Sequence, residues 1–155
     1  MLSDDLIVNG IILDPSNKNK WHVLEIMTRY YCKSLHSSQS DKIFSSILHR
    51  EMSVSTGLGG GVALPHARTD FVDSTKVLFV RFKKGIEWHS MDGLLVNFLF
   101  LIIGPRASTK EYLNVLSNIS KMLSRKNNRS LLLKAKTTKN ILSIFSEVKD
   151  RKYLR

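Results

Sequence analysis

Four parts of the chain repeat apolar residues at helical spacing. Within residues 20–35 the apolar positions follow one another at steps of three and four, which puts them on one face of a helix (Leu24, Met27, Tyr31 and Leu35). Asp41 is suited to cap a second helix that ends near residues 51–52. Ser108 or Thr109 can cap a third helix, which we expect Asn127 and Asn128 to break, and a fourth begins near Thr138.

Two runs between the second and third helices are β-like. Residues 76–82 and 94–103 are rich in branched and aromatic side chains, and the turn-like pairs Lys84-Gly85 and Asp92-Gly93 lie between them. The second run is almost continuously apolar, which indicates an interior strand covered on both faces. This order of elements predicts a layered α/β fold, and we interpret residues 1–155 as a single domain because no linker or repeat divides them.

The composition is that of a globular protein, with 43% hydrophobic and 24% charged residues among 155. The longest apolar run is too short to span a bilayer, and the N-terminus lacks the pattern of a signal peptide. We therefore expect a cytoplasmic protein without membrane insertion. Cys32 has no second cysteine with which to form an internal disulfide, and we interpret it as a packing residue.

The formal net charge of +11 is concentrated near the C-terminus. Residues 121–155 contain eleven Lys and Arg but only two Asp and Glu. These cations alternate with apolar residues at helical spacing and are not interleaved with aromatic residues, which favours a solvated face over a nucleic-acid interface. An acidic protein partner would also suit such a face.

Residues 57–68, GLGGGVALPHAR, carry the most unusual pattern. The stretch has neither the Lys-Ser/Thr of a P-loop nor the glycine spacing of a dinucleotide site. Its glycines can adopt positive φ and allow another chain to approach the backbone closely. A short strand over residues 62–64 should end at Pro65, which cannot donate to a sheet, so we expect His66 at the end or edge of a sheet.

His66 has neighbours that suit a phosphoryl acceptor, although an inert loop histidine is the alternative on spacing alone. Neutral imidazole is a nucleophile with an ordinary pKa of about 6.5. Phosphorylation adds about two negative charges, which Arg50, Arg68 and glycine N–H groups can accept. We expect no cofactor and no metal site, because the other four histidines lack metal-ligand spacing (His22, His36, His49 and His89).

The same residues resemble the signature of a known family. Arg50-Glu51, residues 55–59 (STGLG) and residues 61–68 (GVALPHAR) are similar to the type-2 IIA domains of the bacterial phosphoenolpyruvate-dependent phosphotransferase system. This is the fructose, mannitol and nitrogen-regulatory class. The similarity continues through residues 85–88 (GIEW), residues 91–93 (MDG) and Gly104-Pro105, so it covers nearly the whole chain.

The resemblance implies a mixed central β-sheet flanked by helices on both faces, the anion-transporter-like fold of these domains. It implies that His66 takes a phosphoryl group on Nε2 from the phosphocarrier protein HPr or its nitrogen-branch equivalent, and that Arg50 helps to hold the phosphate. Further residues are expected at the phosphate or partner surface: Thr56, Gly57, Gly59, Gly61 and Arg68. The glycines would then shape a site that a partner's phosphohistidine can reach.

One position departs from the family pattern. Members usually carry a second histidine beside the active one, in a Glu-His-Leu context, where this chain has Glu111-Tyr112-Leu113. A tyrosine hydroxyl can donate a hydrogen bond to phosphate but carries no positive charge near neutral pH. The departure therefore puts fast onward transfer to a IIB domain in question, while Tyr112 could also serve only to pack its helix.

Three functions follow from these observations. The leading hypothesis is a stand-alone, nitrogen-regulatory-type IIA phosphocarrier whose phosphorylation state at His66 alters binding to a regulated protein. The second is a fructose- or mannitol-type IIA that donates to a separate IIB domain. The third is a binding module without phosphotransfer that uses its basic C-terminal segment, with nucleic acid as the disfavoured partner.

Overall fold

A mixed β-sheet forms the centre of the computed structural model, which describes residue 2 and residues 6–147. Its strands run in the order β1-β5-β6-β3-β2, and β4 also pairs with β6. The bounds are β1 Leu6–Leu13, β2 Gly57–Gly59, β3 Val62–Ala63, β4 His66–Thr69, β5 Lys76–Ile86 and β6 Val96–Pro105. Strands β3 and β4 both run parallel to β6, whereas β5 is antiparallel to it.

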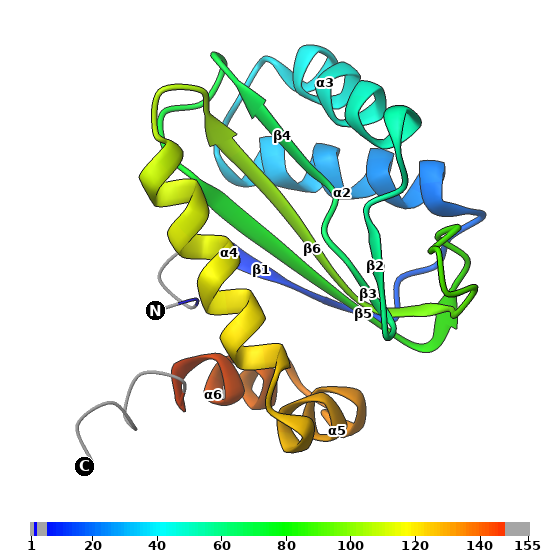
Figure 1. Cartoon of the computed structure of the whole chain (residues 1–155). Helices are drawn as coiled ribbons and strands as arrows, with labels where there is room; N and C mark the ends of the chain where they lie inside the picture. The colour runs from blue at the N-terminus through cyan, green and yellow to red at the C-terminus, as the bar shows by residue number, and fades with distance from the viewer. Residues whose placement is uncertain (1, 3–5, 148–155) are drawn as a thin grey trace.

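Helices cover both faces of the sheet, as Figure 1 shows. Their bounds are α2 Lys20–Ser34, α3 Ser40–Ser53, α4 Thr109–Leu123, α5 Lys126–Lys134 and α6 Thr138–Glu147. Helices α2 and α3 lie on one side of the sheet, and α4, α5 and α6 lie on the other (Figure 1). The layered α/β architecture predicted from the sequence is therefore confirmed.

Strand β6 shows why the sheet needs two helical layers. Leu99, Leu101 and Ile103 belong to the core beneath α2 and α3, while the residues alternating with them belong to the core beneath α4 to α6 (Phe98, Phe100 and Ile102). Successive side chains of a strand point to opposite faces, so an apolar residue at every position requires cover on both sides. The prediction of an interior strand is confirmed, although the strand begins at Val96 because Leu94 and Leu95 are exposed.

Two strand ends differ from the sequence prediction. Lys84-Gly85 does not form a turn, because β5 continues to Ile86 through an irregularity at which Gly85 takes a φ of 77°. The short strand after the glycines ends at Ala63, one residue earlier than predicted, and beyond Pro65 His66 begins β4, which among the described strands pairs with β6 alone and so lies at the edge of the sheet, as predicted. The interruption at residues 64–65 arises because Pro65 lacks an N–H for the ladder.

Two helix predictions also need correction. Asp41 does not cap α3, which begins at Ser40 with Gln39 at the cap position, so Asp41 lies within the first turn. Asn127 and Asn128 lie inside α5 and do not interrupt a helix. The helical structure is interrupted earlier, at residues 124–125, between α4 and α5. Asn128 still contributes to the end of α4, because its Nδ2 donates a hydrogen bond to the Met122 carbonyl there.

The remaining predicted elements are found where the periodicity placed them. Helix α2 matches residues 20–35 and α6 begins at Thr138, while Val148 and the cations after it lie outside the described residues. The pattern gave no sign of β1, an apolar segment with Gly10 at its centre, or of α5. Among the described residues, none of the helices has the length and apolar character to cross a membrane.

Candidate phosphoryl-acceptor site

His66 lies at the first position of β4, between α3 and α4. Strand β4 is only four residues long, and it alternates between half-buried and buried positions. Ala67 packs into the core beneath α2 and α3, so His66 and Arg68 project from the opposite side of the strand. His66 therefore lies at the edge of the sheet, as predicted, and it also opens a strand of its own after the break at Pro65.

Both ring nitrogens of His66 have a partner. Arg50 donates from Nε to His66 Nε2 over 3.1 Å, and His66 Nδ1 lies 2.9 Å from the Leu64 carbonyl oxygen. A guanidinium can only donate and a carbonyl can only accept, so these contacts assign the proton to Nδ1 and the lone pair to Nε2. The ring is therefore held as the neutral tautomer with a nucleophilic Nε2.

The surroundings favour the same neutral form. Burial lowers the pKa of His66 below its ordinary value because the imidazolium is poorly solvated there, and the nearby Arg50 guanidinium lowers it further. The Leu64 hydrogen bond and the Glu51 carboxylate act in the opposite direction without reversing the shift. The lone pair on Nε2 is consequently available at neutral pH.

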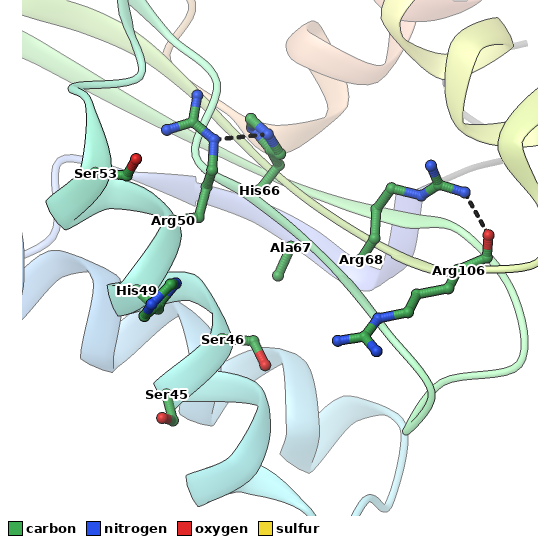
Figure 2. Close-up of a pocket in the computed structure, with 9 residues that line it drawn as sticks. All are labelled: Ser45, Ser46, His49, Arg50, Ser53, His66, Ala67, Arg68 and Arg106. Atoms are coloured by element: carbon green, nitrogen blue, oxygen red, sulfur yellow. Dashed lines mark hydrogen bonds between the residues drawn. The ribbon is translucent and has the colours of Figure 1, made fainter.

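Arg50 is held in place by the end of its own helix. It lies in the last turn of α3, where its Nη1 donates to the Val54 carbonyl oxygen at 2.8 Å. This bond satisfies a carbonyl that the helix leaves unpaired and points Nε at the imidazole (Figure 2). A guanidinium fixed in this way is ready to pair with a phosphoryl group on Nε2.

Tyr112 and Arg68 complete the surroundings of the imidazole. The Tyr112 ring centroid lies 6.0 Å from that of His66, and the Arg68 guanidinium lies 5.7 Å from the Tyr112 ring. Arg68 is itself anchored, because its Nη2 donates to the Arg106 carbonyl and to Thr109 Oγ1. Burial raises the pKa of Tyr112, against the effect of Arg50 and Arg68, so its hydroxyl keeps its proton and can act as a donor.

His66 opens into two cavities. The larger is an open cleft of about 570 Å³ beside α3, shown in Figure 2 and lined by Ser45, Ser46, His49, Arg50, Ser53, His66, Ala67, Arg68 and Arg106. The smaller, of about 320 Å³, is lined by Arg50, Ser55, Thr56, Leu58, Leu64, His66, Tyr112 and Leu116. Three arginines and no carboxylate line the larger cleft, which gives it the charge that an anion requires.

A buried polar network lies immediately behind the imidazole. The Glu51 carboxylate pairs with Lys20 Nζ at 2.9 Å and accepts hydrogen bonds from the backbone N–H and the hydroxyl of Thr56. Trp88 joins the network through its indole N–H, which donates to Thr56 Oγ1, and its carbonyl, which accepts from Lys20. Thr56 thus lines the smaller cavity while its own polar groups are used within the protein.

The glycines make their contacts elsewhere. Gly60 donates its N–H to Asp92 and accepts from Arg129 Nη1 at its carbonyl, both at 2.8 Å, while Gly57 packs against Ser90. Gly59 and Gly61 have φ values of 87° and 80°, which require glycine in the turn between β2 and β3. Of the described residues, Gly57, Gly59 and Gly61 line neither of the two cavities at His66.

Metal ligands are not gathered at this site. Within residue 2 and residues 6–147, no group of three or more His, Cys, Asp or Glu side chains has an arrangement that could hold a metal ion. The polar side chains that line the two cavities beside His66 are guanidinium, imidazole, phenol and hydroxyl groups, which can donate hydrogen bonds to an anion.

Residues 6–148 match the family model described as "Phosphoenolpyruvate-dependent sugar phosphotransferase system, EIIA 2". The chain belongs to this family. The type-2 IIA assignment made on residues 50–68 is therefore confirmed, and it extends over the whole sheet and its helices.

Relatives of this IIA domain carry both sugar-transport and regulatory names. The PTS system fructose-specific EIIABC component of Bacillus subtilis is 30% identical over 94% of this chain, which spans only 23% of that relative's length. The nitrogen regulatory protein of Pseudomonas aeruginosa is 30% identical over 85% of this chain and 86% of its own. The crystal structure of the nitrogen regulatory protein IIA-Ntr of Neisseria meningitidis superposes with a TM-score of 0.84 at 28% identity, covering 93% and 98% of the two chains.

The sequence pointed to the contact between Arg50 and His66 but not to the buried network around Glu51. The family motif includes Glu51 and Trp88 but assigns them no role, and the periodicity places Lys20 only at the start of a helix. A signal was present, because Glu51 follows Ile43 and Ile47 at steps of four and so lies on the buried face of α3, where a carboxylate needs a partner.

Proposed function

We propose that this IIA domain is a phosphohistidine phosphocarrier, located in the cytoplasm, that accepts a phosphoryl group on His66 Nε2 from an HPr-type carrier. The observation that carries the proposal is the pair of hydrogen bonds that hold the imidazole, from Arg50 to Nε2 and between Nδ1 and the Leu64 carbonyl. This arrangement leaves the nucleophilic lone pair on the nitrogen that faces the guanidinium. Family membership gives the reaction class, since IIA domains are transfer components of the phosphotransferase system.

The transfer step balances without a co-reactant. The Nε2 lone pair attacks the phosphorus of the carrier's phosphohistidine, and a new N–P bond forms as the carrier's N–P bond breaks. The carrier's imidazole keeps the bonding electron pair, while His66 keeps its proton on Nδ1, where the Leu64 carbonyl holds it. The transferred dianion then lies beside Arg50, with the Tyr112 hydroxyl and Arg68 as further donors.

Exposed apolar side chains near the site suit a protein as the donor. Leu58 lines the smaller cavity and is 66% exposed, and Val54 follows the helix that carries Arg50 and is 64% exposed. Apolar residues around a polar reactive centre are typical of the centre of a protein interface. We propose that the carrier docks over these side chains and brings its phosphohistidine to the open cleft.

Tyr112 favours the regulatory role over the sugar-transport role. It stands beside His66 where the family resemblance implies a second imidazole, and a phenol cannot take a positive charge as phosphate leaves. The phosphorylated form would then persist and act by changing the charge that a regulated protein meets. The competing role, donation to a IIB domain, has support in the name of the Bacillus relative, an EIIABC component.

Intact mass measurement tests phosphoryl acceptance. The protein is incubated with phosphoenolpyruvate, enzyme I and an HPr-type carrier, alongside His66→Ala and the matched variant His49→Ala, which removes a histidine from the same cleft. We expect one acid-labile phosphoryl adduct on the wild type and on His49→Ala, and none on His66→Ala. An adduct that survives in His66→Ala, or no adduct on any protein with active donors, would overturn the proposal.

A time course separates the two roles. Phosphorylated protein is mixed with IIB domains of the fructose and mannitol type, and the remaining phosphoprotein is measured over time. Persistence for many turnovers of the carrier step supports the regulatory role. Rapid loss to one IIB domain would assign the chain to sugar transport.

A further inference from the structure

The end of the molecule formed by α5 and its flanking segments carries an unbalanced positive charge. From Tyr112 to Ser146 the chain contains seven Lys and Arg and no Asp or Glu. Six of these cations form what we call the α5 basic face: Lys121, Arg125, Lys126, Lys134, Lys136 and Lys139. All are exposed except Arg125, which is half-buried.

The cations of this face are not used inside the protein. Among the described residues, none of the six makes a side-chain hydrogen bond or an ion pair with an acidic residue. The seventh cation differs, because Arg129 donates to the carbonyls of Gly60 and Leu123 and is thereby part of the fold. The positive charges of the α5 basic face therefore repel one another in the free protein, and binding of an acidic surface would relieve that repulsion.

The face is separate from His66. Its first residue, Lys121, lies nine residues after Tyr112 on α4, and nine residues of helix span about 14 Å. Figure 1 shows α5 and α6 at the C-terminal end of α4, away from β4. No residue of the face lines either cavity at His66.

We infer that the α5 basic face docks an acidic protein surface and that it does so independently of phosphorylation. Leu131, 41% exposed, lies on α5 three residues before Lys134, so an exposed apolar side chain neighbours a cation of the face. Protein interfaces have this arrangement, whereas a phosphate backbone offers nothing to cover a leucine. Five of the six cations are lysines, which lack the bidentate geometry that favours phosphate, and no exposed aromatic side chain lies between residues 112 and 146 for stacking on bases.

Binding of an acidic amphipathic peptide tests this inference. The probe is a helical peptide with glutamates around two leucines, and a scrambled peptide of the same composition and a mixed-sequence DNA duplex are measured beside it by fluorescence anisotropy at physiological salt. We expect the ordered peptide to bind more tightly than the scrambled peptide and the duplex. Leu131→Ser should remove the preference for the ordered peptide.

Two triple variants with the same change in net charge test whether peptide binding depends on the α5 basic face or on the total charge of the protein. Lys126, Lys134 and Lys136 are changed to Gln in one protein, and Lys18, Lys33 and Lys84, which are exposed on other elements, in the other. Each exposed ion pair contributes modestly to affinity. Loss of three such pairs should therefore weaken peptide binding about tenfold, and only in the first protein. Equal weakening in both, tighter binding of the duplex, or no peptide binding would overturn the inference.

His66→Ala keeps this test distinct from the proposed phosphotransfer. We expect that variant to bind the peptide as the wild type does, while the first triple variant still accepts a phosphoryl group. Loss of peptide binding in His66→Ala would contradict the independence of the α5 basic face.

Discussion

The two ends of residues 57–68 belong to one sequence motif but make different kinds of contact. At one end, the glycine turn is clamped between Asp92 and Arg129 and makes only structural contacts. At the other, His66 presents a nitrogen lone pair to Arg50 in an open cleft. Gly61 contacts β6 at Asn97 and His66 pairs with Ile102, so five residues of β6, or about 16 Å, separate them.

This difference shows that neighbours in a motif need not share a function. Gly59, Gly60 and Gly61 are required because their backbone lies at positive φ, whereas we propose that His66 and Arg50 are required for chemistry. Changes at the two ends should therefore affect different measurements. Changes around the turn and the buried network should lower stability, and changes around the imidazole should lower transfer.

The largest effect on stability is expected from Glu51→Gln. The substitution leaves the Lys20 ammonium buried without its partner, which costs about 3–5 kcal/mol in the free energy of unfolding. Urea denaturation measures the loss. Glu25→Gln, which breaks an exposed pair with Arg29 on α2, is the matched control and should cost less than about 1 kcal/mol. Similar losses in the two variants would contradict a buried structural role for Glu51.

Arg50→Met should reduce phosphoryl acceptance about a hundredfold, because the dianion loses its closest charged donor. The pH profile should also move. In the wild type the pKa of His66 lies below its ordinary value, so acceptance falls only as the pH drops below about 6.5. Removing the guanidinium raises that pKa, and the fall should begin at higher pH.

Arg50→Lys serves as the control for Arg50→Met. It keeps the positive charge, so its pH profile should follow the wild type even though its geometry lowers the rate. Identical pH profiles for Arg50→Met and the wild type would exclude an electrostatic effect of Arg50 on His66.

Gly61→Ala sharpens the contrast between the two ends. A side chain at a φ of 80° costs about 1–2 kcal/mol, and its Cβ would lie 3.1 Å from Asn97 Oδ1. We expect lower stability in urea but an unchanged rate of phosphoryl acceptance by the folded protein. Gly93→Ala has similar strain but open space around its Cβ, so it should cost less. A large loss of rate in Gly61→Ala would place the turn in the reaction after all.

The smallest effect is expected from Tyr112→Phe. Loss of one hydroxyl donor near the phosphoryl group should change the lifetime of the phosphoprotein by about fivefold, the value of one hydrogen bond. Mass spectrometry after removal of the donors measures that lifetime. Tyr112→His should instead add a titrating group, which would appear as a second transition in the pH dependence of onward transfer. No change in either variant would leave Tyr112 a purely packing residue.

The sequence was most informative where a residue's own chemistry decides its place. The periodicity over residues 20–35 predicted α2, and the apolar run from residue 94 predicted a doubly covered strand, because burial patterns follow local spacing. The motif from Arg50 to Arg68 was sufficient for the family. It was less reliable at element ends: Gly85 and the asparagines at residues 127–128 are typical of turns, yet strand β5 and helix α5 incorporate them into regular structure.

By itself, therefore, the sequence determined the type of fold and the family, and it singled out His66 and Arg50 as the candidate reactive pair. Only the tertiary structure decided which side chains meet that pair. It brought Tyr112 beside His66, turned Glu51 inward to Lys20, and placed Gly60 between Asp92 and Arg129. These contacts join residues far apart in the chain through sheet register and helix packing, which local propensity does not encode.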